Sequence, residues 1–402
     1  MSENHKDPSS LRVPGFRANG IAAGIKTNGG KDLALIVSDH PARAAAVFTT
    51  NSFKAAPVLQ DMRKIVSGTA RAIIVNSGCA NAATGEQGVA DAGAMARVVS
   101  SRLGFHEDQV LVASTGSIGK RLPLERIEGG ADELVAGLRE EGMQDASEAI
   151  MTTDRFPKTA QRSVHLGGRD IRLCGIAKGA GMIEPNMATM LAFFFTDAVV
   201  DGRYLDRVFR QAMDQSFNAI SVDGCMSTND TAIILANGAA GNDPLKPRST
   251  GCVIFREALF DMAFQLARLM VRDGEGATKL IDIRVEGCRN RGDAKRVAYA
   301  IGRSSLVKTA FFGGDPNWGR IISAVGSTGV PLHPEQTELH FNDRLIFKNG
   351  TGVVENHAEL ESIMKEDTIA VLVNLNMGGG SFRLLASDLT HEYIDINAFY
   401  HT

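Results

Sequence analysis

The stretch of this chain that is most able to do chemistry is a glycine-rich loop that runs into a strongly apolar segment, KGAGMIEPNMATMLAFFF, beginning at Lys178. Ala188 and Thr189 lie where the two parts meet. Attack of the Thr189 hydroxyl on the Ala188 carbonyl would turn the peptide bond into an ester, and hydrolysis would leave Thr189 as a new N-terminus. Because an α-amine has a pKa of about 7.7–8.0, part of it is neutral near pH 7 and accepts the hydroxyl proton. The same residue would then supply both nucleophile and base.

Spacing alone favours a structural explanation of these residues. Thr189 is then a β-branched residue at the start of a buried strand, and Gly179 and Gly181 form the turn before it. Most threonines at such junctions are structural. The chemical hypothesis therefore depends on what surrounds the segment.

Alternating strand and helix patterns surround it. Runs rich in β-branched residues that end in small or polar ones predict buried strands. These runs cover residues 32–39, 44–50, 71–78 and 109–115. Apolar residues spaced three and four apart predict a long helix at 255–271, and a second helix is predicted at 203–213. Without any internal repeat, this pattern indicates an α/β or α+β fold.

The length of the chain and a glycine-rich turn predict its domains. At roughly 150 residues per domain, 402 residues predict two or three lobes. The predicted helix at 255–271 runs into DGEGATK at 273–279, and a strand-like LIDIRVEG follows. We therefore predict a main domain over residues 1–280 and a C-terminal domain over residues 281–402.

Composition argues against several classes of protein. A net charge of −3 and 22% charged residues without a basic stripe predict no nucleic-acid partner. The longest apolar run, residues 187–194, is far below the ~20 needed to cross a bilayer, and the N-terminus lacks signal character, so we expect no membrane association and a cytoplasmic protein. Five dispersed cysteines and nine dispersed histidines show no metal-ligand spacing, so we expect no metal and no disulfide framework.

Several further motifs occur in order along the chain. They are NSG-x-AN at 76–81, STG-x-IG at 114–119, MTTD at 151–154, SVDG-x-x-STNDT at 221–231, RDGEGATK at 272–279, NWGRI at 317–321 and INA-x-Y-x-T at 396–402. Together with KGAGMIEPNMATML, this series resembles the ornithine acetyltransferase (glutamate N-acetyltransferase) family from about Val13 to the last residue. An ordered series of motifs is far more specific than any one of them.

The resemblance implies a fold and a maturation step. Family members form a four-layer αββα sandwich with a smaller C-terminal α/β domain. They are cut before the threonine of the ATML motif, which here separates an α chain, 1–188, from a β chain, 189–402. Two α and two β chains form a heterotetramer, and the active site lies near the interface between the sandwich and the smaller domain.

The resemblance also implies the reaction. Thr189 takes the acetyl group from N-acetylornithine, ornithine leaves, and the amine of glutamate then attacks the ester to give N-acetylglutamate. Thr115 and Gly116 match the residues that stabilise the oxyanion, although an S-T-G turn at a strand end is the better explanation of them when they are taken alone. No cofactor is expected, and the motifs leave open whether acetyl-CoA is a second co-substrate.

The resemblance assigns substrate contacts along the whole chain. They are Thr152, Lys178, Thr189, Glu275, Asn397 and Thr402. Thr153 stays an alternative to Thr152. Structurally, Lys178 is also explained as a solvated loop lysine and Glu275 as an exposed acid at a helix end. The two C-terminal contacts require a tail that docks over the pocket instead of fraying.

Some positions depart from the family pattern. Phe399 stands where aspartate is usual, Cys225 and Met226 replace an aspartate and a threonine, and Ser117 replaces a valine. Substrate preference is therefore less secure than mechanism. Two alternatives stay open at this point: a self-processing amidohydrolase or aminopeptidase that transfers the acyl group to water, and a non-catalytic paralogue.

Overall fold

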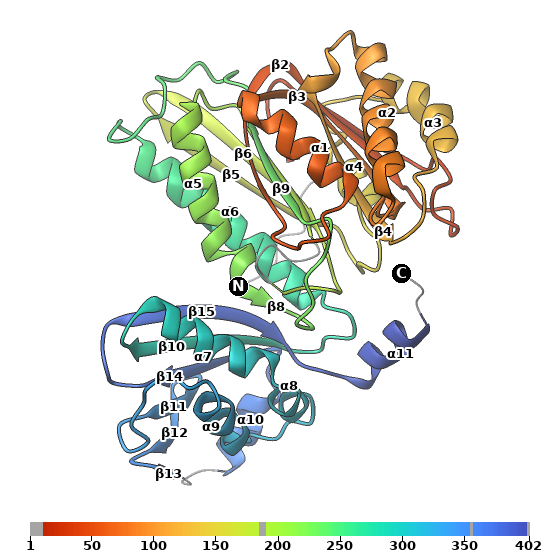
Figure 1. Ribbon diagram of the computed structural model, residues 1–402. Coiled ribbons are helices and arrows are strands. Elements are labelled where there is room, and N and C mark those ends of the chain that lie inside the picture. Colours follow the sequence, from red (N-terminus) through yellow and green to blue (C-terminus); the bar gives the residue numbers. More distant parts are fainter. Residues whose placement is uncertain (1–10, 185–189, 354–356, 400–402) are drawn as a thin grey trace.

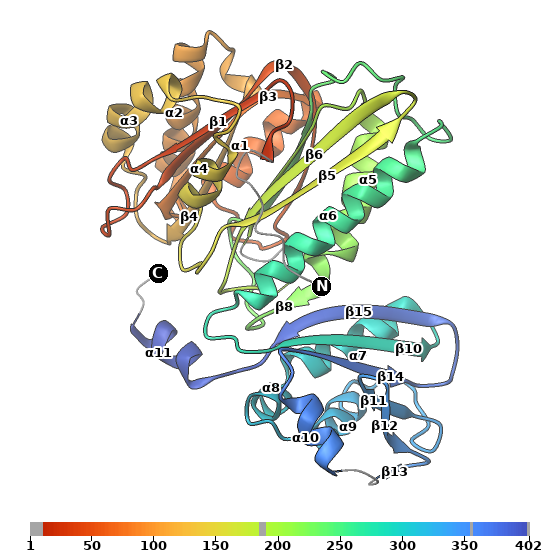
Figure 2. The same ribbon diagram turned by 180° about the vertical axis from the view of Figure 1, so that it is seen from behind.

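The structure, a computed structural model, describes residues 11–184, 190–353 and 357–399 (Figures 1 and 2). A larger part, formed mainly by residues before 280, lies above a smaller part formed by later residues. The predicted boundary at 281 lies next to the first residue of β10 (Leu280–Cys288), the first long strand of the smaller part.

The larger part is built on a mixed sheet with helices on two sides. The strand order is β4-β3-β2-β9-β7-β6-β5, and β1 pairs with β2. The strands are β1 Phe16–Ile21, β2 Leu33–Phe48, β3 Thr69–Cys79, β4 Val110–Ser117, β5 Lys158–Leu166, β6 Arg169–Lys178, β7 Leu191–Thr196 and β9 Thr231–Ala236. The helices are α1 Ala56–Lys64, α2 Gly85–Leu103, α3 Leu124–Ala136, α4 Met143–Ala149, α5 Gly202–Gln215 and α6 Cys252–Arg272.

Alternate side chains of these strands enter different cores, because successive residues of a strand face opposite sides of the sheet. On β7, Phe194 packs with α5 and α6, whereas Phe193 packs into a second core shared with β1 and β2. On β3, Ile73 joins that second core, and Ile74 packs against α2 and α3. The two halves of this one sheet face each other across the second core, so that across the described residues the layers run helices, strands, strands, helices. The predicted αββα sandwich is confirmed.

The predicted elements agree with the structure, with one correction. The strands predicted at 71–78 and 109–115 lie within β3 and β4, and both predicted helices lie within α5 and α6. The prediction of separate strands at 32–39 and 44–50 is wrong, because both belong to β2. Exposed residues 39–41, including a proline, break the alternation in the sequence, but a register shift against β3 absorbs them without ending the strand.

The smaller part has its own sheet, in the order β13-β12-β11-β14-β10-β15-β8, and its own hydrophobic core. The strands besides β10 are β8 Ile220–Ser221, β11 Glu338–Phe341, β12 Arg344–Lys348, β13 Thr351–Gly352, β14 Thr368–Asn374 and β15 Gly380–Ser387. The helices are α7 Arg291–Arg303, α8 Ser305–Phe312, α9 Trp318–Gly326, α10 His357–Met364 and α11 His391–Phe399. After β15 the chain returns toward the larger part as α11 (Figure 1).

Candidate active site

Residues that the sequence analysis selected from distant parts of the chain line a cavity of about 150 Å³. They are Thr115, Gly116, Thr152, Lys178, Glu275 and Asn397. Thr153, the alternative to Thr152, also lines it. The predicted cleavage pair, Ala188 and Thr189, and the predicted contact Thr402 lie outside the described residues.

The fold nevertheless holds Met190, the first described residue after the predicted cleavage pair, in a fixed position. Met190, the next residue, is buried, its N–H donates to Asp230 Oδ1 at 3.0 Å, and its carbonyl accepts from the N–H of Thr231 at 3.1 Å. Leu191 then begins β7, opposite Lys178 of β6. Met190, the first described residue after the gap, therefore leads into the end of β7 that pairs with Lys178.

Thr115 and Gly116 lie at the end of β4, where the strand approaches β3 unusually closely. Gly116 has a φ of +130°, and a Cβ there would lie 2.3 Å from the carbonyl carbon of Gly78. Asn229, buried, holds the two strand ends together by donating from Nδ2 to the carbonyls of Ala80 at 2.6 Å and Ser114 at 2.8 Å. This position therefore requires glycine, and its backbone is held rigidly beside the cavity.

Gly116→Ala is expected to lower kcat for acyl transfer by about 10²–10³-fold, which is the typical effect of losing one oxyanion donor. The added methyl group cannot fit against β3, so the strand end and its N–H must move. Steady-state kinetics will measure the loss. As a control, Gly119→Ala alters a glycine with positive φ in the same motif but meets no atom within 4 Å, and the same assay should show a much smaller loss.

Lys178 is buried, which makes the alternative of a solvated loop lysine wrong. Its Nζ donates to Thr152 Oγ1 at 2.7 Å and to Thr115 Oγ1 at 3.1 Å. Burial lowers the pKa of its ammonium, and the carboxylates of Asp154, Glu275 and Asp230 act in the opposite direction. Of the two adjacent threonines, Thr152 is the one with a hydrogen bond to this lysine.

Glu275 and Asn397 meet across the cavity, where Asn397 Nδ2 donates to Glu275 Oε2 at 2.8 Å. α11 docks closely enough that a Cβ on Gly276 would lie 2.5 Å from the backbone nitrogen of Tyr393. In the described part of the tail, α11 therefore reaches the cavity through Asn397. Glycine at 181 leaves room for the carboxylate, since a Cβ there would lie 2.3 Å from Glu275 Oε2.

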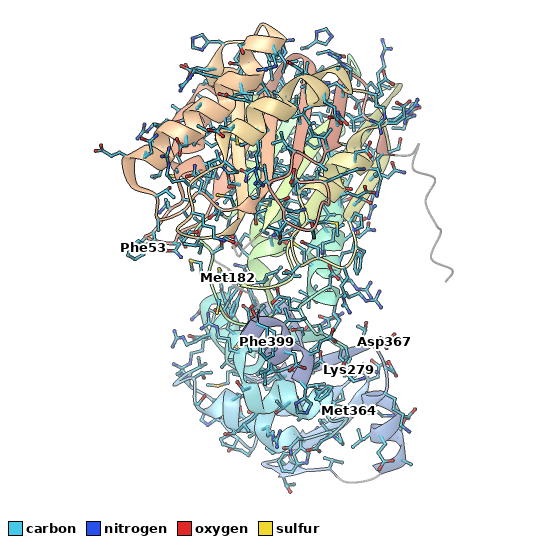
Figure 3. The ribbon with its side chains drawn as sticks, turned by 90° about the vertical axis from the view of Figure 1, so that its right-hand side faces the viewer. Phe53, Met182, Lys279, Met364, Asp367 and Phe399 are labelled. Carbon is cyan, nitrogen blue, oxygen red and sulfur yellow. The ribbon has the colours of Figure 1, made fainter. Side chains whose placement is uncertain are left out.

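The departures from the family pattern do not line this cavity. Phe399 is 81% exposed on α11 (Figure 3). Cys225 is exposed, and its N–H donates to Asp223 Oδ1 at 3.1 Å. The carbonyl of Met226 accepts from Asn51 Nδ2 at 3.2 Å. None of these residues, nor Ser117, is among the described residues that line the cavity.

Sequence reasoning missed a buried cluster of charges behind the cavity. Lys158, with a fully buried side chain, lies 2.5 Å from a carboxylate oxygen of Asp154 and 2.5 Å from one of Asp273. Arg155 binds Asp273 through its backbone N–H and through Nε, both at 3.0 Å. Asp154 and Asp273 belong to motifs that were recognised, MTTD and RDGEGATK, but nothing in the sequence around Lys158 indicated a charge pair.

Asp230 was also missed, although it belongs to the STNDT motif. Burial raises its pKa well above the ordinary value for a carboxyl group, and hydrogen bonds from the Met190 N–H and from Thr49 oppose that shift. It is thus a buried carboxyl group directly beside the point where the predicted nucleophile joins β7.

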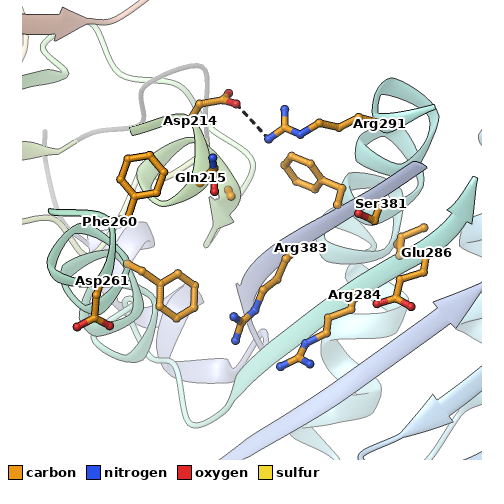
Figure 4. A pocket seen from close by; sticks show the side chains of 13 residues that line it. Asp214, Gln215, Phe260, Asp261, Arg284, Glu286, Arg291, Ser381 and Arg383 are labelled. Carbon is orange, nitrogen blue, oxygen red and sulfur yellow. Dashed lines mark ion pairs between the residues drawn. The ribbon is translucent and has the colours of Figure 1, made fainter. Parts of the chain in front are cut away.

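A larger groove, of about 910 Å³, lies elsewhere (Figure 4). It runs between α6 and the strands β10 and β15, and none of the described site residues lines it. Its arginines are already paired: Arg291 binds Asp214 at 3.0 Å, and Arg284 and Arg383 share Asp282. Size alone therefore does not identify the chemical site, and the smaller cavity is the better candidate.

Within the part of the chain that the structure describes, no group of three or more His, Cys, Asp or Glu side chains is arranged to hold a metal ion. No described helix is long and apolar enough to span a membrane.

Comparison with known proteins decides the family. Residues 17–402 match the model of the ArgJ family. The chain therefore belongs to the ArgJ family. It is 52% identical over 393 residues to the arginine biosynthesis bifunctional protein ArgJ of Geobacter sulfurreducens, which covers 98% of this chain and 100% of the relative. The protein of the same name from Symbiobacterium thermophilum is 44% identical over 390 residues, covering 96% of this chain and 97% of the relative.

A solved structure of a family relative is also similar. The arginine biosynthesis bifunctional protein argJ of Bacillus halodurans matches this ArgJ family member with a TM-score of 0.50 and 37% sequence identity. The match covers 98% of the solved chain but 52% of the present one. The solved chain is therefore about half as long as this one.

Proposed function

We propose that this ArgJ family member is an acetyltransferase of arginine biosynthesis that moves the acetyl group of N-acetylornithine to glutamate through Thr189. The observation that carries the proposal is the cavity itself. Its lining includes the predicted oxyanion pair and four of the six predicted substrate contacts, and one of these, Lys178, pairs with Leu191 at the start of β7. Identity of 52% to a relative named for arginine biosynthesis supports the pathway.

The first step in this proposal is self-cleavage. The Thr189 hydroxyl adds to the Ala188 carbonyl carbon, the C–N bond breaks, and the acyl group moves from nitrogen to oxygen. This shift frees the amine of Thr189. Water then hydrolyses the ester, which frees the carboxylate of residue 188 and restores the hydroxyl of Thr189. A cut there leaves a C-terminal chain, 189–402, of a little over half of the 402 residues. The match to the solved relative covers a similar share of this chain, 52%.

Acyl transfer then uses the new amine as the base. It accepts the proton of the Thr189 hydroxyl as the oxygen attacks the acetyl carbonyl, and it returns the proton to the leaving ornithine amine. The backbone N–H of Gly116 and the hydroxyl of Thr115 stabilise the oxyanion. Because the Lys178 ammonium can only donate, Thr115 Oγ1 accepts that hydrogen bond and keeps its own hydrogen free to donate to the oxyanion.

The charges around the cavity suit an amino acid. In the proposed complex, the Lys178 ammonium binds the substrate carboxylate and Glu275 binds the substrate ammonium. N-acetylornithine carries both groups at opposite ends, and glutamate brings a carboxylate to the same lysine. A general amidohydrolase or aminopeptidase would have no comparable need for this pair of opposite charges.

Glu275→Gln is expected to lower kcat/KM for N-acetylornithine by about 10–100-fold, mainly through KM, because a charge-assisted hydrogen bond contributes about 1.5–3 kcal/mol. The amide keeps the size of the side chain and can still contact Asn397, so self-cleavage should be normal. Initial rates over a range of substrate concentrations will measure the effect. Equal KM values for variant and parent would show that Glu275 does not bind this substrate.

A product assay separates transferase from hydrolase. The processed protein is incubated with N-acetylornithine, with and without glutamate, and products are identified by mass spectrometry. The proposal predicts N-acetylglutamate and ornithine in equal amounts when glutamate is present. Free acetate at the same rate with or without glutamate would favour the hydrolase, and the absence of both products would favour a non-catalytic paralogue.

Assembly and a second donor belong to the same proposal. Because the relatives are named bifunctional, we include acetyl-CoA as a second acetyl donor, which is tested by release of free thiol in the presence of glutamate. The proposed assembly is a heterotetramer of two α and two β chains in the cytoplasm. Native mass spectrometry will give its stoichiometry.

A further inference from the structure

We propose that Asp154 is a positioning residue of the active site, which fixes the backbone on both sides of the cavity and keeps the ammonium of Lys178 charged. The inference rests on the proposed function, since it concerns how Lys178 acts in the transfer reaction. Asp154 does not line the cavity among the described residues, so it acts through its neighbours.

The first support is the set of hydrogen bonds that the Asp154 carboxylate accepts. Oδ2 accepts from the N–H of Thr152 at 2.9 Å, and Oδ1 accepts from the N–H of Gly179 at 2.6 Å. These groups belong to the loop before β5 and to the residue directly after Lys178. A single carboxylate therefore sets the spacing between Thr152 and Lys178, whose side chains are hydrogen-bonded to each other.

The second support is the way that the carboxylate is held. The buried Lys158 bridges Asp154 to Asp273. Asp273 is the C-cap residue of α6 and lies two positions before Glu275. The bridge therefore links the three backbone segments that carry Thr152, Lys178 and Glu275. It also joins the predicted 1–188 chain to the predicted 189–402 chain, because Asp273 belongs to the second.

The third support is the balance of charge at Lys178. Burial disfavours its ammonium, and Asp154 is the strongest of the charges that act against burial. Asp154 itself stays ionised: Lys178 and Lys158 outweigh the effect of burial and lower its pKa to about 2. The charged groups that face Lys178 are Asp154, Lys158, Glu275, Asp230 and Lys26.

The test compares Asp154→Asn with Asp273→Asn in the full processed protein. Both replace a buried carboxylate on Lys158 by an amide, so urea denaturation should show similar losses of stability. Of these two carboxylates, only Asp154 is among the charges that act on Lys178. The two variants should therefore differ in the pH dependence of kcat/KM. We expect the alkaline limb of Asp154→Asn to lie about one pH unit or more below that of the wild type, because loss of a nearby opposite charge shifts a pKa by about 1–3 units. The limb of Asp273→Asn should stay in place.

An unmoved alkaline limb in Asp154→Asn, or equal shifts in both variants, would overturn the inference. An inactive wild type would instead overturn the proposed function, and the inference would fall with it. Asp154→Asn could fold but be inactive. In that case Lys178 is acetylated in trace amounts with acetic anhydride across the same pH series. Peptide mass spectrometry of the product then reports the neutral fraction of Lys178 directly. That fraction should rise at lower pH than in the wild type, and coincident curves would contradict the proposal.

Discussion

Thr189→Ala is expected to give a single uncut chain of 402 residues with acetyl transfer reduced by on the order of 10⁴-fold or more. The hydroxyl is the nucleophile of both reactions in this account. Alanine has no hydroxyl, so the substitution removes cleavage and transfer together. The fold should be unaffected, because β7 begins at Leu191 and its partner strands β6 and β9 do not include residue 189. Denatured intact mass and the product assay measure the two effects.

Thr189→Ser is the matched control for this prediction. It keeps a hydroxyl at the same position, so it should still cut itself and transfer acetyl groups, at a lower rate. Normal cutting of Thr189→Ala at residue 188 would refute the assignment of the nucleophile, whatever the activity of the serine variant.

Lys158→Met is expected to lower the free energy of unfolding by about 3–5 kcal/mol. Methionine has a similar length, so little packing is lost, but Asp154 and Asp273 are left as buried carboxylates without their shared cation. Urea denaturation at neutral pH, at equal protein concentration for every variant, will measure the change. A loss below 1 kcal/mol would show that the cluster contributes little to stability.

Arg155→Gln is the control for this substitution, since it removes another cation from Asp273. The Arg155 side chain is about half exposed, so its ion pair is screened by solvent and should contribute at most about 1 kcal/mol.

The stability of the protein in acid gives a second test of the Lys158 cluster. Asp154 has a lowered pKa, about 2, so the stability from its charge is present above the unfolded pKa of about 3.9 and is lost as pH falls toward 2. Lys158→Met should show a smaller loss over that interval.

The layered fold could be predicted only in part from the pattern of the residues. Short buried strands and amphipathic helices predicted the mixed class, and the apolar run predicted a buried strand, which the structure shows to be buried on both faces as β7. The αββα order came from family resemblance. Residue patterns do not encode which of Phe193 and Phe194 faces which core, because both faces of β7 are apolar.

The candidate site could be predicted where it was carried by motifs. Lys178 and Glu275 were named from their motifs, and the structure brings both to the same cavity. Lys158 could not be found in this way, because it is a lone lysine at the start of a strand and its partner Asp273 is 115 positions away in the chain. A buried ion pair depends on tertiary packing, and the sequence gives no local signal of which lysine is desolvated.

The most direct test of the central claim is the denatured intact mass of the purified protein before and after brief exposure to N-acetylornithine. The account predicts two chains, 1–188 and 189–402, with one acetyl group added to the second and located at Thr189 by peptide mapping. A single chain of 402 residues with no added mass would contradict both self-cleavage and transfer through Thr189.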